Sequence, residues 1–255
     1  MADQLRLRLL QWESGLDATD NRARLAEAVT GSADLVVLPE AFARDFGEAG
    51  SEVSPFAEDA DGPFASELEL QAESAGTTIV AGMFETAPDP DRPFNTLLVR
   101  GAARASYRKI HLYDSFGHRE SDRLSGGALE PVVVEVAGWQ VGLMTCYDLR
   151  FPELARRLVD VEAEVLVVPA AWLPGPRKVA HWQTLLSARA IENTVYVVGV
   201  GQPAPRYCGH SRVVSPLGDV LAEAGPGEAV LEVVLNRAGL EEARSTNPSL
   251  ANRRL

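Results

Sequence analysis

The chain has 255 residues, of which 46% are hydrophobic and 24% charged, an ordinary globular composition that is sufficient for a large hydrophobic core. Its formal net charge of −12 would repel a phosphate backbone or an anionic membrane surface, so nucleic acid and membranes are poor partners. No apolar run approaches the roughly 20 residues that span a bilayer.

The first half of the chain predicts strands and helices in alternation. Residues 5–11 alternate weakly between apolar and polar side chains, as in a strand, whereas residues 20–29 have apolar side chains at helical spacing. The short apolar run 35–38 predicts a buried strand. Residues 63–75 predict a helix with proline in its first turn and Gly76 at its end. Further strands are expected at 78–82, 96–100 and 106–111.

The second half repeats this alternation. Strands are expected at 132–136, 141–144, 165–168, 195–200, 211–214, 220–222 and 230–235, and helices at 152–160, 179–192 and 238–244. The turn sequence PLGD at 216–219 makes a hairpin of the strands on either side of it. Because no linker separates two compositions, we expect one α/β domain over residues 1–255, with helices covering layered sheets.

The N-terminus and the cysteines suggest a cytoplasmic protein. Arg6 and Arg8 lie inside the only apolar run near the N-terminus, which therefore predicts an opening strand and not a signal peptide. Cys146 and Cys208 are the only cysteines, and a chain of this length needs no disulfide. Both are therefore expected to be free thiols in a reducing compartment.

Three apolar segments end in a polar residue next to a turn, where α/β proteins place their sites. They are LVVLPEAF with Glu40, YRKIHLYD with Lys109 and VGLMTCYDLRFPEL with Cys146. A thiol is only slightly ionised at neutral pH, so a nucleophilic cysteine needs a base or a positive charge nearby. A carboxylate can take the proton and return it to a leaving amine. An ammonium can hold the oxyanion that develops on a carbonyl.

Taken singly, each of these residues also has a structural explanation. Glu40 would cap a helix, Lys109 would reach solvent from an edge strand, and Cys146 would be a small core residue. A cysteine–histidine dyad is disfavoured, because no histidine lies in a motif typical of one. The histidines also lack the i, i+4 spacing of a helical metal site; they are His111, His118, His181 and His210.

In combination, the three segments resemble the nitrilase superfamily of carbon–nitrogen hydrolases, whose catalytic glutamate, lysine and cysteine occur in this order. The resemblance covers almost the whole chain and is most specific in GLMTCYDLRFPEL and HWQTLLSARAIEN. It implies that Glu40 is the general base, Lys109 the oxyanion stabiliser and Cys146 the nucleophile. It also implies a four-layer α-β-β-α sandwich, usually paired through helices into a homodimer or a larger homo-oligomer.

The resemblance assigns two further groups. The segment RESDRLSGG is similar to the Glu-Ser-x-x-Leu-Ser-x-Gly form of the family, which gives the role of its second glutamate to Glu120, with Glu130 and Glu135 as alternatives. The backbone N–H of Tyr147 becomes the second oxyanion donor. The implied reaction proceeds through a cysteine thioester, with no metal and no organic cofactor.

Residues 147–153, YDLRFPE, resemble the amidase branch that includes ω-amidase and deaminated-glutathione amidase, whereas true nitrilases usually carry Trp-Glu-Asn there. The expected substrate is therefore a small-molecule amide of a carboxylic acid, cleaved with release of ammonia. Only ten residues lie between Lys109 and Glu120, a shorter loop than in ω-amidase-like members, and this would widen the pocket. An N-carbamoyl or general aliphatic amidase remains the alternative enzyme, and a catalytically silent scaffold the alternative without activity.

Overall fold

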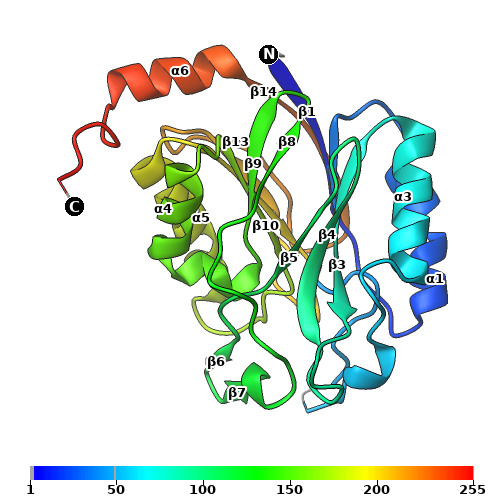
Figure 1. The fold of residues 1–255 in the computed structure, drawn as a ribbon. Helices are drawn as coiled ribbons and strands as arrows, with labels where there is room; N and C mark the ends of the chain where they lie inside the picture. Colours follow the sequence, from blue (N-terminus) through cyan, green and yellow to red (C-terminus); the bar gives the residue numbers. More distant parts are fainter. Residues whose placement is uncertain (1–2, 49, 255) are drawn as a thin grey trace.

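A computed structural model describes residues 3–48 and 50–254. Two six-stranded sheets lie face to face, and helices cover the outer face of each sheet (Figure 1). The layers therefore follow the order α-β-β-α, and the predicted four-layer sandwich is confirmed. No helix in the described ranges is long and apolar enough to cross a membrane.

The first sheet has the strand order β14-β1-β2-β3-β4-β5, in which β1, β2 and β3 are parallel and the other pairs antiparallel. Its strands are β1 Gln4–Gln11, β2 Leu35–Val37, β3 Thr78–Glu85, β4 Phe94–Gly101, β5 Ala105–Arg108 and β14 Ala229–Asn236. The outer face is covered by α3, Pro63–Ala75, and the short helices α1, Ala18–Ala23, and α2, Leu25–Ala28, lie on the same side.

The second sheet has the order β13-β12-β11-β10-β9-β8. Its strands are β8 Val133–Val136, β9 Trp139–Leu143, β10 Val165–Ala170, β11 Tyr196–Gly201, β12 Arg212–Val214 and β13 Val220–Glu223. The outer face is covered by α4, Pro152–Asp160, and α5, Lys178–Asn193. A terminal helix, α6, Arg237–Thr246, follows β14.

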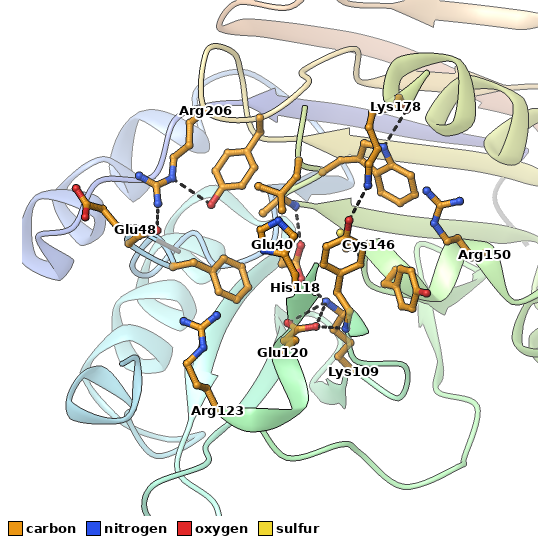
Figure 2. A pocket seen from close by; sticks show the side chains of 18 residues that line it. Glu40, Glu48, Lys109, His118, Glu120, Arg123, Cys146, Arg150, Lys178 and Arg206 are labelled. Carbon is orange, nitrogen blue, oxygen red and sulfur yellow. Dashed lines mark hydrogen bonds and ion pairs between the residues drawn. The ribbon is translucent and has the colours of Figure 1, made fainter. Parts of the chain in front are cut away.

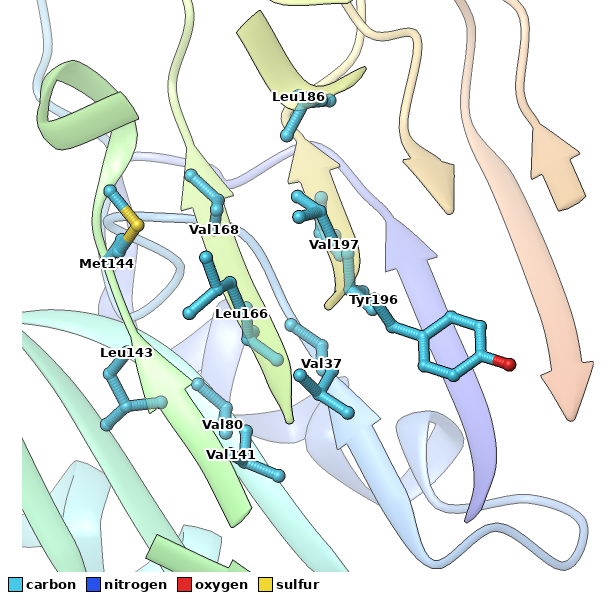
Figure 3. Close-up of a cluster of buried hydrophobic side chains, with 14 of the residues drawn as sticks. Val37, Val80, Val141, Leu143, Met144, Leu166, Val168, Leu186, Tyr196 and Val197 are labelled. Carbon is cyan, nitrogen blue, oxygen red and sulfur yellow. The ribbon is translucent and has the colours of Figure 1, made fainter. Parts of the chain in front are cut away.

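The largest hydrophobic cluster includes the space between the sheets, as Figure 3 shows around Val37, Val80 and Val141. Successive residues of a strand point to opposite faces, so Val37 packs against the second sheet while Val36 packs against the helices. Truncating one fully buried aliphatic side chain costs roughly 2–5 kcal/mol. This packing holds the two sheets together, so the loops at the strand ends start from fixed positions.

Strand β5 ends at Arg108 and not at His111, and three larger differences from the sequence-based expectation remain. The helix predicted at 20–29 is divided into α1 and α2, and it begins earlier because the Asp17 carboxylate accepts the N–H groups of Thr19 and Asp20. Strand β10 runs through Pro169 instead of stopping there. This proline lies beyond the last β9–β10 pair, so its missing N–H removes no bond to β9.

The third difference is a set of short elements that no periodicity predicted. They are the two-stranded ribbon of β6, Asp114–Ser115, and β7, His118–Arg119, and the 3-10 helices η1 Ser54–Phe56, η2 Glu120–Asp122 and η3 Cys146–Arg150. Segments of two to five residues are too short to show a hydrophobic period. Two of them, η2 and η3, carry predicted site residues.

Candidate active site

Four of the predicted site residues line one cavity of about 180 Å³: Glu40, Lys109, Glu120 and Cys146 (Figure 2). Each is at most 8% exposed. Glu40 follows β2 and Lys109 follows β5, both in the first sheet, whereas Cys146 follows β9 of the second sheet. The site is therefore assembled where strands of the two sheets end.

The Glu40 carboxylate is held by three donors. Its Oε1 accepts hydrogen bonds from Asn95 Nδ2 at 2.7 Å and Lys109 Nζ at 3.0 Å, and its Oε2 accepts the backbone N–H of Ala171 at 2.6 Å. Strand β3 approaches closely here, because a Cβ at Gly82 would overlap the backbone of Glu40. The carboxylate therefore has a fixed position and one ionic partner.

Lys109 lies between two carboxylates. Its Nζ donates to Glu40 Oε1 and to both oxygens of Glu120, at 3.1 and 2.9 Å. Burial alone would lower the pKa of this ammonium, but the charges of Glu120 and Glu40 outweigh burial and raise its pKa well above the ordinary value. Lys109 is therefore a cation at neutral pH, although it is only 2% exposed.

Glu120 is fixed by the backbone as well as by Lys109. Its Oε2 accepts the N–H of Tyr113 at 2.6 Å. The glycines that follow it have a packing reason: the N–H of Gly127 donates to the Lys109 carbonyl at 2.9 Å, and a Cβ at Gly127 would overlap the Arg108 carbonyl. The motif that singled out Glu120 therefore folds against the lysine segment.

Cys146 opens η3 with φ of +47°, a left-handed conformation that costs a residue with a side chain roughly 1–3 kcal/mol. Burial raises the pKa of its thiol well above the ordinary value. The charge of Glu40 and a hydrogen bond with Glu40 act in the same direction, while Lys109 opposes them. The resting group is therefore the thiol, and it contacts a carboxylate that can accept its proton.

The backbone N–H of Tyr147 lies in the first turn of η3, where helical N–H groups have no partner within the helix. It donates to no acceptor in the described part of the chain. The Tyr147 ring lines the cavity and packs edge-on against Tyr113, with ring centroids 5.0 Å apart.

The alternatives to Glu120 lie elsewhere. Glu130 and Glu135 are exposed, and neither lines the cavity that contains Cys146. Among the histidines, His118 lines this cavity, whereas His111 bonds to Asp148, His181 lies near Arg150 and His210 near Glu223.

Cys208 is buried and free, and its sulfur lies 3.5 Å from the Leu173 carbonyl oxygen. It does not line the cavity that contains Cys146. In the described ranges, no group of three or more histidine, cysteine, aspartate or glutamate side chains is arranged to hold a metal ion.

One wall of the cavity carries two cations that sequence reasoning missed. Lys178 is 7% exposed; its Nζ donates to the Tyr113 hydroxyl at 2.6 Å and lies 3.9 Å from the Phe116 ring centroid. Arg150 lies over the Trp172 ring at 4.9 Å, and its Nε is buried without a partner. Burial, and then the charge of Arg150, lower the pKa of Lys178.

Neither cation of this wall pairs with a carboxylate of the described residues. The cations across the cavity in Figure 2 are already satisfied: Arg206 pairs with Asp45 at 2.9 Å, and Arg123 donates to the Ser51 carbonyl. The positive wall of Arg150 and Lys178 is therefore the part of the cavity that can receive an anion.

Sequence reasoning also missed Asn95, which bonds to Glu40 at 2.7 Å and to Glu120 at 3.4 Å. An asparagine directly before the strand predicted at 96–100 was its only signal in the sequence. The Ala171 N–H carried none, because a backbone donor has no sequence signature.

A buried cysteine beside a lysine held between two glutamates, in a four-layer sandwich, defines the class of protein. The family model described as carbon-nitrogen hydrolase matches residues 6–245. The chain belongs to the carbon–nitrogen hydrolase family, and the predicted membership of the nitrilase superfamily is confirmed. The expectation of an enzyme that hydrolyses carbon–nitrogen bonds other than peptide bonds is confirmed with it.

Characterised relatives support this assignment. The chain is 39% identical over 234 residues to a deaminated glutathione amidase of Escherichia coli, covering 90% of this chain and 88% of that one. It is 38% identical over 258 residues to a 2-oxoglutaramate amidase of Paenarthrobacter nicotinovorans, covering 92% and 84%. A CN-hydrolase superfamily protein of Xanthomonas campestris, solved with an arsenic adduct in its active site, has a TM-score of 0.89 at 32% identity, covering 100% and 98%.

Replacing Glu120 tests the second glutamate. Glu120→Gln removes the negative charge and one of the two oxygens that contact Lys109, so we expect turnover to fall roughly tenfold while Cys146 is still acylated. Glu120→Ala leaves Lys109 with only Glu40 and should lose more. Steady-state rates and intact-protein mass spectra measure the two effects.

The exposed residues Glu130 and Glu135 provide matched controls, because both lie outside the cavity. Their alanine variants should turn over like the wild type. A Glu120→Ala variant with wild-type turnover, or a larger loss at either control position, would remove Glu120 from the site.

Proposed function

We propose that the protein is a cofactor-independent amidase that hydrolyses the C–N bond of a small carboxylic-acid amide through a thioester on Cys146. The observation that carries this proposal is the shared cavity of Cys146, Glu40 and Lys109, in which Lys109 Nζ donates to the Glu40 carboxylate at 3.0 Å. The names of two relatives, deaminated glutathione amidase and 2-oxoglutaramate amidase, support an amide as substrate.

The first half of the reaction forms the thioester. Cys146 Sγ attacks the amide carbonyl carbon while Glu40 removes the thiol proton. The carbonyl oxygen becomes an oxyanion, which the Lys109 ammonium and the Tyr147 N–H stabilise. Glu40 then gives its proton to the amide nitrogen, the C–N bond breaks, and ammonia leaves.

The second half releases the acid. Glu40 removes a proton from a water molecule, which attacks the thioester carbonyl, and the same two donors hold the second oxyanion. The C–S bond then breaks and the proton returns to the Cys146 sulfur. Throughout, Glu120 keeps the Lys109 ammonium in place through its two contacts.

The positive wall favours a substrate with a second, negatively charged group. Lys178 and Arg150 have no carboxylate partner among the described residues and lie on one side of Cys146 (Figure 2). A substrate carboxylate there would gain charge-assisted hydrogen bonds to both. Within the amidase class, this favours an ω-amide of a dicarboxylic acid over a neutral aliphatic amide.

A panel of amides tests the activity. We expect ammonia release from ω-amides of keto acids to exceed release from acetamide-type amides and N-carbamoyl amino acids. A trapped acyl-enzyme on Cys146, seen as a mass increase of the intact protein, tests the thioester. Absence of ammonia release and of acylation with every compound would leave the silent scaffold as the better description.

Removing a cation of the positive wall should act on binding. With Lys178→Met or Arg150→Met, we expect KM for a carboxylate-bearing amide to rise at least about tenfold, since a hydrogen bond to a charged group contributes roughly 1.5–3 kcal/mol. The matched measurement is the KM for a neutral amide, which should change little. An equal change in KM for the carboxylate-bearing amide and the neutral amide would contradict a carboxylate subsite at this wall.

The proposal also includes the oligomeric state of the protein and its cellular location. An assembly of two or more copies is consistent with the exposed apolar side chains Ile191, Leu217, Val220 and Leu221, which lie on α5 and the β12–β13 hairpin. Light scattering after size exclusion would measure it, and a monomeric mass would contradict it. A free nucleophilic thiol suits the reducing cytoplasm.

A further inference from the structure

One buried carboxylate outside the four catalytic residues links the lysine segment to the nucleophile turn. Asp148 is 0% exposed and lies on η3, two residues after Cys146. Its Oδ2 accepts the Tyr107 hydroxyl at 2.6 Å and the backbone N–H of Thr145 at 2.9 Å. Its Oδ1 accepts the backbone N–H of His111 at 3.0 Å and lies 2.8 Å from His111 Nδ1.

These donors flank both reacting groups. Tyr107 precedes Lys109 by two residues and His111 follows it by two, while Thr145 directly precedes Cys146. Because an ionised carboxylate only accepts hydrogen bonds, His111 Nδ1 carries a hydrogen in this contact. A single side chain therefore contacts a residue on each side of Lys109 and the residue before Cys146.

The link matters because no strand pairing fixes Lys109 relative to Cys146. Lys109 follows β5, at the edge of the first sheet, whereas Cys146 follows β9 in the second sheet. The sheets meet through side-chain packing, which sets an angle and a spacing but no hydrogen-bond register. Asp148 adds a directional contact between the segment of Lys109 and the turn of Cys146.

We propose that Asp148 is a positioning residue that sets the separation between the Lys109 ammonium and the Cys146 sulfur. The inference rests on the proposed function, because it concerns the place where the oxyanion forms. That oxygen must lie about 3 Å from its donors, and a displacement of about 1 Å can cost on the order of 100-fold in rate. Asp148 acts through geometry, not by touching the substrate.

Two further observations favour positioning over simple packing. A buried carboxylate costs more free energy than an apolar side chain of its size, so packing alone does not account for it. In addition, the His111 ring stacks on Phe151, with centroids 3.7 Å apart and planes 7° apart. This stack fixes the plane of the ring that contacts Asp148.

The experiment compares two buried tyrosine hydroxyls of the same hydrophobic cluster. Tyr107→Phe removes one donor to Asp148, and we expect kcat to fall about tenfold with KM within about twofold, as for a lost transition-state contact. Tyr196→Phe is the matched control: it removes a hydrogen bond of 3.0 Å to the Asn236 carbonyl, far along the chain from the site. It should lower thermal stability similarly and leave kcat unchanged.

Asp148→Asn and His111 variants extend the test. We expect Asp148→Asn to lower kcat about 100-fold, with the pH midpoint of Cys146 alkylation by iodoacetamide unchanged. His111→Asn keeps a donor near the Nδ1 position and should retain most of the activity that His111→Ala loses. If Asp148→Asn does not fold, Tyr107→Phe and the His111 pair decide the question.

The outcomes separate the two proposals. An active wild type with wild-type kcat in Tyr107→Phe, or with a raised KM and unchanged kcat, overturns the positioning role alone. A kcat loss in Tyr196→Phe as large as in Tyr107→Phe would reduce Asp148 to a general stability effect and overturn it as well. A wild type that hydrolyses no amide overturns the proposed function and this inference together.

Discussion

The Cys146→Ala variant is expected to be folded and inactive. The change removes one sulfur from a side chain that is 8% exposed, so the free energy of unfolding should change by only about 1 kcal/mol. Loss of a covalent nucleophile, by contrast, lowers kcat by roughly 10⁴-fold or more. Ammonia release measured together with the thermal midpoint separates the two effects.

Cys208→Ala is the matched control for the nucleophile. This second buried thiol lies beside the Leu173 carbonyl and outside the cavity, so the variant should turn over nearly like the wild type. Iodoacetamide should label Cys146 faster than Cys208, because only Cys146 lines the cavity that contains the Glu40 carboxylate. A Cys146→Ala variant with more than about a tenth of the wild-type rate would rule out covalent catalysis by this residue.

The sequence predicted the strands before Glu40 and Cys146 well, because a buried strand has a strong local signal. The apolar runs before Glu40 and Cys146 are the cores of β2 and β9, and each polar residue lies just past its strand. The pairing of these ends in space could not follow from local periodicity. It came from the family resemblance, and the distances around Lys109 came only from the structure.

What the sequence did not predict has a common physical reason. Lys178 is distant in the chain from Arg150, and their common wall exists only because α5 begins near the turn that follows Cys146. Backbone donors such as the Ala171 N–H have no residue type to identify them. Positive φ at Cys146 is also invisible in sequence, since cysteine rarely adopts it.

The second large effect is expected at Lys109, where charge and shape can be separated. Lys109→Arg keeps the positive charge but replaces a compact ammonium with a planar fork, in a site where the side chain is 2% exposed. The fork cannot occupy the position between Glu40 and Glu120 without displacing one of them. We therefore expect kcat to fall by roughly 10²–10³-fold, nearly as far as in Lys109→Ala, as for loss of an oxyanion donor.

Lys109→Met separates the two roles of the cation. Without the ammonium, no cation of the described residues lies between Glu40 and Glu120, and the Asn95 amide is the one donor that they share. Because both the positive charge and the proposed oxyanion donor are lost, kcat of Lys109→Met should fall at least as far as that of Lys109→Ala. Lys109→Arg retains the charge, so its pH profile should follow the wild type at a lower rate. A Lys109→Arg variant with wild-type kcat would mean that Lys109 contributes only its positive charge and no directed hydrogen bond, and that the oxyanion is held by other donors.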